Sequence, residues 1–461
     1  MPAMPATDST TSAAPPPGAA STAGLVVRPF RGLRYDPARV SDLAAVTSPP
    51  YDVIDADSAV HLAELDPHNV VRLILPRPSD AAPGGEDGDR VGAAVGVGTD
   101  SGGGPSRYLP SRAALDAWLA EGVLVRDREP TIYVYEQSAP GLVQRGLLAT
   151  VELRDPADRV VLPHEDVMPG PVEDRLDLMR TTSANLEPIL LVYDGGKDTA
   201  RVIDEVCAGE PLVETSAEDG LLQRLWAITD PATQDRVARD LAPRQALIAD
   251  GHHRYATYRR LQAEHQAAGD GRGDWDLGLA MLVDSTTHPL RVQAIHRVVG
   301  GLGFADALAR LGSVFRVDDA GGDLETALGR LQAAAGRHPF VLTDGGSFAL
   351  LDEPAAAEVE AAMPSGEHSP DWRELDASVL HGLILDRLWA VDDAGGRTAY
   401  LHDAPSAVRA AQRADGVAVL MRPVTVDVVR TLAARGERMP RKSTSFGPKP
   451  RTGLVLRLLD R

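Results

Sequence analysis

The protein has 461 residues, of which 43% are hydrophobic and 25% are charged, values typical of a globular protein large enough for two or three domains. Its formal net charge of −19 argues against a general nucleic-acid-binding surface, which needs clustered basic residues, but allows a local basic pocket for a small anion. The single cysteine, Cys207, excludes an internal disulfide and favours a cytoplasmic location, and no apolar run approaches the roughly 20 residues that span a bilayer.

Two segments have compositions that cannot support a packed core. Residues 1–23 are rich in Pro, Ala, Ser and Thr and lack the basic start and apolar centre of a secretory signal, so we expect a disordered tail. Residues 79–106 contain little bulky apolar sequence and are predicted to form a disordered insertion. The folded core is expected to run from 24 to 460, with a possible division near residue 300.

The first half of the core is predicted to contain both helices and strands. After the rigid Pro49-Pro50 pair we expect a short extended piece, Tyr51–Ile54, and then a helix near Ser58–Glu64 that Asp55 or Asp57 can cap. The elements that follow are a buried strand at Val70–Leu75, a helix at Ser111–Glu121, paired strands at Thr131–Gln137 and Arg145–Leu153, and a strand at Ile189–Tyr193.

The second half continues this alternation. We expect a helix beginning at Val202–Val206, a strand at Gln245–Ala249 with a helix after it, strands at Leu277–Val283, Leu290–Ile295 and Gly453–Leu459, and mixed elements across 304–413. Because helices and strands alternate without strict β-α-β regularity, the sequence predicts the α/β class, with mixed sheets and flanking helices.

Asp250-Gly-His-His-Arg254 is the strongest candidate site, because it lies at a predicted strand-to-helix junction. Gly251 permits a tight turn, and the N–H groups of the helix start lie beside His252, His253 and Arg254, a combination that favours a phosphate or another anion. Asp250 could bind Mg²⁺ or orient His252. Alternatively, Asp250 only caps the helix and the histidines are surface residues. Zinc is a third interpretation, but adjacent histidines point in different directions and no cysteine is nearby.

His164-Glu-Asp166 and the segment 173–189 form a second candidate. Glu165 could hold Mg²⁺ together with Asp250, or accept a proton. Arg175 and Arg180 are spaced to clamp phosphate oxygens. The same charges could equally belong to a solvated helix face.

Lysine usage points to a third candidate. Lys and Arg together number 47, yet only three of them are lysines, and two of the three, Lys442 and Lys449, fall within Met439–Pro450. We call this segment the lysine loop. A compact ammonium suits a pocket for phosphate or carboxylate better than a planar guanidinium does when only a point charge is wanted.

The lysine loop is not a Walker phosphate-binding loop. Residues 436–443 approach the GxxxxGK[ST] pattern, but Arg441 replaces the second glycine and a strand is predicted to follow where the pattern needs a helix. We expect Lys442, Ser443, Thr444 and Lys449 to line an anion pocket close to residues 250–254, with the C-terminal strand in the same sheet.

Four motifs together resemble an uncharacterised conserved family of prokaryotic cytoplasmic proteins, a domain of unknown function. In chain order they are PPYDVI, HED with DRLDLMRTTSAN, DGHHRYAT and MPRKSTSFGPKPRTGLV. The resemblance extends from about Leu25 to Leu459. The sequence departs from the family pattern at Ser445 and Gly447, where aromatic residues are usual, so no stacking role is expected there.

The DGHHR segment is in turn similar to the phosphate-binding box of the ParB-like and sulfiredoxin-like superfamily, which includes free serine kinases. That resemblance implies a ParB/sulfiredoxin-like element around the strand-turn-helix, in which Gly251, His252, His253 and Arg254 would hold the phosphates of a nucleotide, ATP or ADP.

These observations lead to the expectation of a nucleotide-dependent phosphotransferase that acts on a small hydroxylated metabolite, with free L-serine as the leading substrate. Asp52 or Glu165 would accept the hydroxyl proton, and Asp250 and His252 complete the catalytic set. The alternatives are a non-catalytic nucleotide-binding regulator of the ParB-like type and a phosphate-ester hydrolase. Neither nucleic acid nor a membrane is an expected partner, and the sequence does not indicate an oligomeric state.

Overall fold

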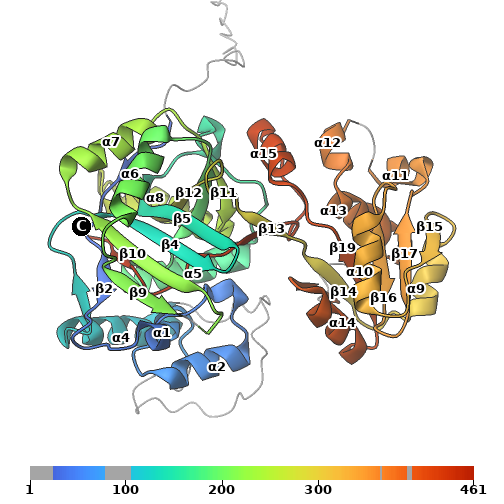
Figure 1. The fold of residues 1–461 in the computed structure, drawn as a ribbon, viewed down its shortest axis with the longest axis horizontal. Coiled ribbons are helices and arrows are strands. Elements are labelled where there is room, and N and C mark those ends of the chain that lie inside the picture. Colours follow the sequence, from blue (N-terminus) through green and yellow to red (C-terminus); the bar gives the residue numbers. More distant parts are fainter. Residues whose placement is uncertain (1–23, 78–104, 217, 364–365, 392–396, 461) are drawn as a thin grey trace, which may run out of the picture.

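A computed structural model describes residues 24–77, 105–216, 218–363, 366–391 and 397–460. The predicted tail, 1–23, and residues 79–104 of the predicted insertion lie outside the described residues. The described chain forms two lobes that lie side by side (Figure 1). Within these ranges, no helix has the length and apolar character needed to cross a membrane.

The first lobe is built on a nine-stranded sheet with the order β6-β11-β8-β12-β5-β4-β10-β9, in which β1 also pairs with β5. Its strands are β1 (Val27–Arg28), β4 (Ile132–Ala139), β5 (Leu142–Glu152), β6 (Val161–Leu162), β8 (Ile189–Tyr193), β9 (Val213–Ser216), β10 (Leu222–Ile228), β11 (Ala246–Asp250) and β12 (Leu277–Asp284). Since β11 is parallel to β6 and antiparallel to β8, the sheet is mixed. The predicted mixed α/β class is confirmed.

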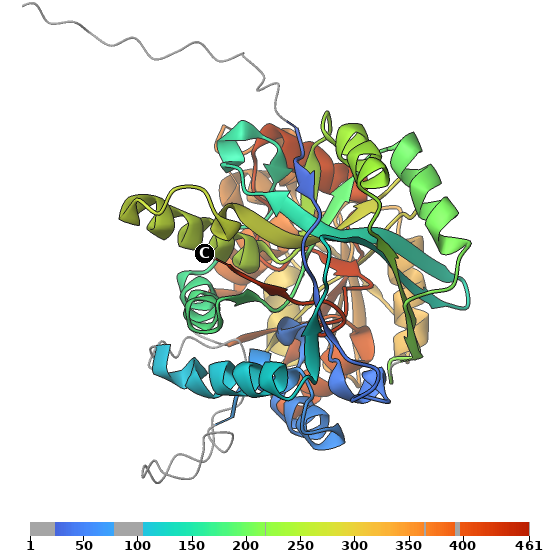
Figure 2. The ribbon, with the colours of Figure 1, turned by 90° about the vertical axis from the view of Figure 1, so that its left-hand side faces the viewer.

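Helices cover one face of this sheet. They are α5 (Pro169–Thr182), α6 (Lys197–Cys207), α7 (Pro231–Leu241) and α8 (His252–Ala268). Their apolar side chains, such as Leu176, Val237 and Tyr258, pack with strand residues in one buried cluster. A small helical layer, α1 (Leu43–Val46), α2 (Ala56–Leu65), α3 (Val71–Ile74) and α4 (Leu109–Ala120), lies along one end of the lobe (Figures 1 and 2).

The C-terminal part of the chain covers the opposite face of the same sheet. Strand residues such as Leu190 and Leu247 share a buried cluster with Leu432 of α15 (Val426–Arg435) and with Met439 and Phe446 of the lysine loop. The chain therefore leaves the first lobe, builds the second, and returns to close the first. This return carries the lysine loop to the sheet.

The second lobe has its own six-stranded sheet, with the order β15-β17-β16-β19-β14-β18. Its strands are β14 (His296–Val299), β15 (Arg316–Asp319), β16 (Phe340–Thr343), β17 (Phe348–Asp352), β18 (Thr398–Leu401) and β19 (Val417–Met421). The helices around it include α9 (Phe304–Leu311), α10 (Leu324–Ala333), α11 (Ala356–Ala362), α14 (Ala404–Arg413) and the π-helix η6 (Val379–Trp389). The change of sheet falls at β14, while the possible division of the core near residue 300 stays a prediction.

Four predicted elements differ in the structure. The helix expected to begin at Val202–Val206 begins at Lys197, and these residues lie in its last turns. Val70–Leu75, predicted as a strand, contains a largely buried helical turn, α3. The prediction was wrong because a short apolar run has no periodicity that distinguishes a helix from a strand. Tyr51–Val53 is a 3₁₀ turn after Pro50 rather than an extended piece. Of Gly453–Leu459, only Arg457–Leu458 (β21) forms a strand, and it pairs with β7 (Ala184–Asn185) instead of joining the nine-stranded sheet.

Gly416, just before β19, lies against the end of β14. A Cβ on Gly416 would lie 2.1 Å from the carbonyl oxygen of Val299, whereas one on Gly329 in α10 would meet no atom within 4 Å. We expect Gly416→Ala to destabilise the protein by roughly 1–3 kcal/mol, and Gly329→Ala to be neutral or stabilising by up to about 1 kcal/mol. Calorimetry checks both, and an unchanged Tm for Gly416→Ala would contradict the close approach.

Candidate functional site

Asp250 ends β11 and Gly251 turns the chain into α8. Gly251 has φ +93°, and a Cβ there would lie 2.9 Å from Cγ2 of Ile189, so both backbone conformation and space require glycine. No side chain caps α8. The first N–H groups of a helix have no intrahelical partner, so this end of α8 offers donors and a partial positive charge to an anion. The expected strand-turn-helix is present, while its likeness to ParB-like proteins stays a prediction.

The ammonium of Lys449 links two carboxylates from distant parts of the chain. Its Nζ lies 2.5 Å from Oδ2 of Asp52 and 2.7 Å from Oδ1 of Asp250. The other oxygen of Asp250, Oδ2, accepts a hydrogen bond from Nη2 of Arg254 at 2.5 Å. The side chains of Lys449, Asp52 and Asp250 are only 14%, 21% and 11% exposed. These four residues form the group that we call the charge cluster.

The charge cluster shifts the pKa values of Asp52 and Lys449 in directions that keep both groups ionised. Burial alone would raise the pKa of Asp52, but the Lys449 ammonium, followed by the Arg254 guanidinium, holds that pKa well below its ordinary value. Burial alone would lower the pKa of Lys449, but the carboxylates of Asp250 and Asp52 raise it well above its usual range. The cluster is therefore a set of paired charges at neutral pH.

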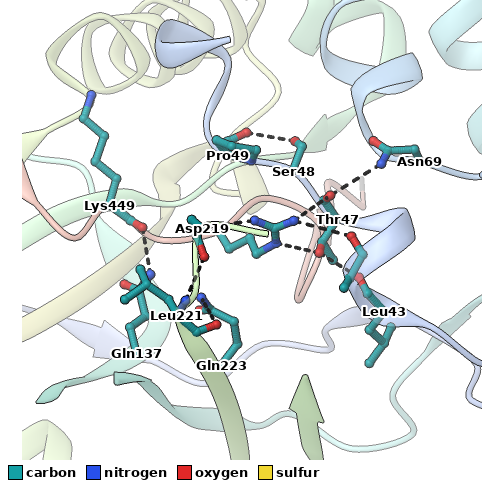
Figure 3. Close-up of polar contacts among 12 residues, drawn as sticks. Leu43, Thr47, Ser48, Pro49, Asn69, Gln137, Asp219, Leu221, Gln223 and Lys449 are labelled. Atoms are coloured by element: carbon teal, nitrogen blue, oxygen red, sulfur yellow. Dashed lines mark hydrogen bonds and ion pairs between the residues drawn. The ribbon is translucent and has the colours of Figure 1, made fainter. Parts of the chain in front are cut away.

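Amide side chains from the sheet hold the backbone of the lysine loop. Nε2 of Gln137 donates to the carbonyl oxygen of Lys449 at 3.0 Å, and Nε2 of Gln144 donates to that of Pro448 at 2.9 Å. Figure 3 shows the Lys449 carbonyl turned toward Gln137 while the side chain extends away from this contact. The loop backbone is thus anchored so that the ammonium can reach the charge cluster.

Glu187 positions Asp52 from the other side. Its Oε1 accepts from the backbone N–H of Tyr51 at 2.9 Å and from Oγ1 of Thr452 at 3.2 Å. One buried carboxylate therefore joins the PPYDVI segment to the C-terminal segment, next to the residue that pairs with Lys449.

His164 and His252 form a buried pair with perpendicular rings, 4.4 Å between centroids and 86° between planes. The backbone N–H of His164 donates to Nε2 of His252 at 3.3 Å, so the proton of His252 belongs on Nδ1. Burial lowers the pKa of His164 to about 3 and, with the neighbouring His164 and His253 rings, lowers that of His252 well below its usual value. Both rings are neutral at physiological pH.

Glu165 is held by the lysine loop. Its Oε1 accepts from the N–H of Ser443 at 3.1 Å and from the N–H and hydroxyl of Thr444 at 3.4 and 3.3 Å. Burial raises the pKa of Glu165, although the nearby Lys442 ammonium and these donors oppose the shift. The hydroxyl of Thr444 also lies 2.7 Å from Nε2 of His164. Segments 164–166 and 439–444 are thus joined side by side.

The Lys442 ammonium is close enough to Glu165 and His253 to lower the pKa of both groups. Lys442 adopts the left-handed region at φ +55°, which is uncommon for a residue with a side chain and occurs where the surroundings impose it, often at functional sites. Burial, and after it the Lys442 ammonium, lowers the pKa of His253, whose Nε2 accepts from the N–H of Met168 at 3.1 Å. The structure therefore brings Lys442 and Lys449 to residues 250–254, as the sequence led us to expect.

The guanidinium groups of three predicted phosphate ligands make hydrogen bonds or ion pairs with other residues of the protein. Arg175 is buried, donates to Asp174, Tyr108 and the carbonyl of Ile74, and stacks on Tyr51 at 4.3 Å. Arg180 pairs with Glu264, Asp177 and Glu173 at the surface, the solvated face that was the alternative. Arg254 donates to Asp250 and, at 2.5 Å, to the carbonyl of Pro188. Arg175 and Arg180 are therefore committed to structural contacts. Nε of Arg254 is buried without a hydrogen-bond partner among the described residues, so its role as a phosphate ligand stays a prediction.

The predicted magnesium pair does not form one site. Asp250 belongs to the charge cluster, whereas Glu165 serves Ser443 and Thr444. Across the part of the chain that the structure describes, no group of three or more His, Cys, Asp or Glu side chains is placed to hold a metal ion. Magnesium is therefore not assigned to any of the described residues.

Sequence reasoning missed His402, which follows β18 in the second lobe. Its pKa is lowered first by burial and then by the ammonium groups of Lys449 and Lys442, which places the ring near the charge cluster. Its Nδ1 is buried and has no hydrogen-bond partner within the described residues. The lysine loop also contacts the second lobe directly, because Nη2 of Arg297 in β14 donates to the carbonyl oxygen of Arg441 at 3.2 Å, so the site borders both lobes. No local pattern around His402 could have indicated its position.

Sequence reasoning also missed Gln137 and Gln144, although an amide side chain inside an apolar strand is a usable signal of a polar contact.

The sequence of this chain matches the model of a known protein family. Residues 27–378 match the model of a family described as a protein of unknown function, DUF1015. The chain belongs to the DUF1015 family. The range that matches the DUF1015 model contains Asp52, Glu165 and residues 250–254, and it ends before His402 and the lysine loop. No curated protein matches the chain.

Several solved structures show distant similarity. A mutant free serine kinase in complex with ADP matches with 16% identity and a TM-score of 0.34, over 65% of this chain and 87% of that chain. A conserved hypothetical protein from Pyrococcus furiosus matches with 16% identity and a TM-score of 0.31, over 65% and 90%. SbnI with a C-terminal truncation, from Staphylococcus aureus, matches with 12% identity and a TM-score of 0.32, over 65% and 82%. Similarities of this size do not assign an activity to this chain.

Lys449→Met tests the charge cluster. The substitution leaves Asp52 and Asp250 without their shared ammonium, so we expect a loss of about 3–5 kcal/mol in the free energy of unfolding. The double variant Lys449→Met/Asp52→Asn should recover part of that loss, because one unpaired carboxylate is gone. Lys197→Met, at the exposed start of α6, is the control and should change stability by less than about 0.5 kcal/mol. Urea unfolding measures all three, and equal stability of the single variant and wild type would contradict the pairing.

Acid should destabilise the protein through its neutral histidines. The pKa of His164 is about 3 when folded and about 6.5 when unfolded, so the unfolded chain binds more protons between these values. The stabilisation is complete above about pH 6.5 and is lost as the pH falls toward 3, with about 2 kcal/mol lost by pH 5 for His164 alone. Urea unfolding at pH 7 and pH 5 should show a smaller difference for His164→Gln than for wild type or for His61→Gln. Identical differences would mean that His164 is not buried as a neutral ring.

Proposed function

We propose that the protein is a nucleotide-dependent phosphotransferase that uses ATP or ADP to phosphorylate a small hydroxylated metabolite, free L-serine before others. One observation supports this proposal: the start of α8 lacks a side-chain cap, and the Lys442 ammonium is close enough to lower the pKa of both His253, in that first turn, and Glu165. Phosphoryl transfer needs positioned donors and positive charge around the phosphate and a group that receives the acceptor's proton.

The start of α8 and Lys442 are suited to the phosphate. The N–H groups of His252 and His253 lie in the first turn of α8, where donors have no intrahelical partner. Lys442 adds a compact positive charge beside them. Lys449, by contrast, is committed to two carboxylates, so it supports the site and only Lys442 keeps the role of phosphate ligand.

Glu165 is the better of the two predicted bases. Burial raises its pKa, which makes the carboxylate a stronger proton acceptor near neutral pH, whereas Asp52 has a lowered pKa because of Lys449. Within the described residues, the hydrogen bonds to its side chain all end on Oε1, so Oε2 is left without one. In the proposed step the acceptor oxygen bonds to the terminal phosphorus, the bond from phosphorus to the leaving nucleotide breaks, and the hydroxyl proton moves to Glu165.

The test is turnover of ATP and of ADP with a panel of amino acids, with products identified by mass spectrometry. The proposal expects a phosphorylated amino acid, with L-serine giving the highest rate. Nucleotide consumption that releases inorganic phosphate without a phosphorylated acceptor would indicate the hydrolase. Nucleotide binding without turnover would indicate the regulatory protein.

Two variants locate the activity at this site. Glu165→Gln should lower kcat at least 100-fold while KM for the nucleotide changes little, because it removes the proton acceptor and keeps the shape. Lys442→Arg keeps the charge and the β-carbon that φ +55° constrains, yet replaces a compact ammonium with a wide fork, so turnover should fall at least tenfold. Lys197→Arg and Glu173→Gln are the matched surface controls. Full activity in both site variants would rule out this site.

A further inference from the structure

A cavity of about 580 Å³ lies beside the candidate site. One wall consists of Asp166 and residues 437–441 of the returning chain, and the other consists of His368, Trp372, His381 and Asp386 of the second lobe. The volume is within the range of small-molecule sites. Asp166 follows Glu165 directly, and Arg441 precedes Lys442, so the same two segments present one set of residues to the candidate site and their neighbours to the cavity.

Arg438 provides an anion-binding group at the wall of the cavity. Its Nη1 is buried and lacks a hydrogen-bond partner within the described residues, and its Nε lies 3.9 Å from Oδ1 of Asp166, too far for a hydrogen bond. A buried guanidinium nitrogen without a partner is costly unless a ligand satisfies it. Arg438 also contributes to the lowered pKa values of His164 and His252, after burial, so it lies between the cavity and the candidate site.

Acidic groups face the same space from both walls. Asp166 is 70% exposed, and its side chain is 3.9 Å from Nε of Arg438. His381 and Asp386 come from the π-helix η6. In a π-helix hydrogen bonds join residues five apart, so residues 381 and 386 lie one above the other on a single face, which an α-helix would not allow. The rare winding therefore brings a histidine and a carboxylate to one cavity.

The aromatic wall is held in place by the returning chain. The rings of Trp372 and His368 stack with centroids 3.6 Å apart, and Nε1 of Trp372 donates to the carbonyl oxygen of Arg438 at 2.7 Å. Glu437 accepts from the N–H of Ser369 at 2.9 Å, at the start of α12 (Pro370–Arg373). The two walls are thus joined at their rim, and Arg438 is fixed by the segment that carries it.

We infer that this cavity binds the phosphate acceptor, and that the acceptor is a small zwitterion with an anionic oxygen group and an ammonium. The anionic group would pair with Arg438, and the ammonium with the carboxylates of Asp166 and Asp386. Its hydroxyl would then approach Glu165, the chain neighbour of Asp166. The role of the ligand as phosphate acceptor rests on the proposed function, whereas the binding of a zwitterion rests on the cavity alone.

Three probes, each with a hydroxyl group, test separately how much each of the two charges contributes to binding. L-serine carries both charges, D-glycerate only the carboxylate and ethanolamine only the ammonium. Isothermal titration without nucleotide should show binding of L-serine and at least tenfold weaker binding of the other two. Arg438→Gln and Asp386→Asn should each weaken L-serine binding at least tenfold, whereas Arg435→Gln, whose guanidinium pairs with Asp371 outside the cavity, should not change it.

The outcomes separate this inference from the proposed function. L-serine binding that depends on Arg438, with no phosphorylated product, supports the cavity and rejects the phosphotransferase. Formation of phosphoserine with an unchanged KM for L-serine in Arg438→Gln overturns the cavity and leaves the phosphotransferase in place. Failure of all three probes to bind wild type, or equal binding of all three, also overturns it. Arg438→Lys keeps a positive charge in case Arg438→Gln does not fold, and it should bind L-serine more weakly than wild type.

Discussion

The ammonium of Lys449 lies between the carboxylates of Asp52 and Asp250, and this contact ties together three parts of the chain that are far apart in sequence. Asp52 belongs to the N-terminal layer, Asp250 to the end of a strand in the main sheet, and Lys449 to the segment that returns from the second lobe. Each charge is buried enough that losing a partner would be costly. The position of the lysine loop, and with it the candidate site, depends on this arrangement.

The return of the chain to the first lobe gives the site its two sides. Segments 164–166 and 439–441 lie in contact, with the N–H of Met439 donating to the carbonyl of His164 at 2.8 Å. In and beside these segments, Lys442 is close enough to Glu165 and to His253 of α8 to lower the pKa of both, while Asp166 and Arg438 line the cavity shared with the second lobe. A nucleotide site and an acceptor site would thus share one backbone framework, which is a direct way to keep two reactants at a fixed distance.

The biased use of basic residues has a physical explanation in this arrangement. Arginine supplies the forks that hold the scaffold, as Arg175 and Arg254 do with carbonyl and carboxylate partners. Of the three lysines, Lys197 is exposed, Lys449 places one compact charge between two carboxylates, and Lys442 is close enough to His253 to lower its pKa. The surrounding histidines are kept neutral by burial, so the positive charge available to a ligand comes from very few groups.

The sequence by itself determined the elements that have strong local signals and the residue types of the site. Strands such as β4, β5 and β12 and the helix α4 follow from periodicity, and Gly251 follows from the turn that it must make, because these signals act over a few residues. Tertiary packing decided the rest. It made α3 a helical turn, committed Arg175 and Arg180 to structural contacts, wound η6 as a π-helix and brought His402 to the charge cluster. These outcomes depend on contacts between residues far apart in the chain, and the free energy of such contacts is set by burial and charge pairing that no local pattern records.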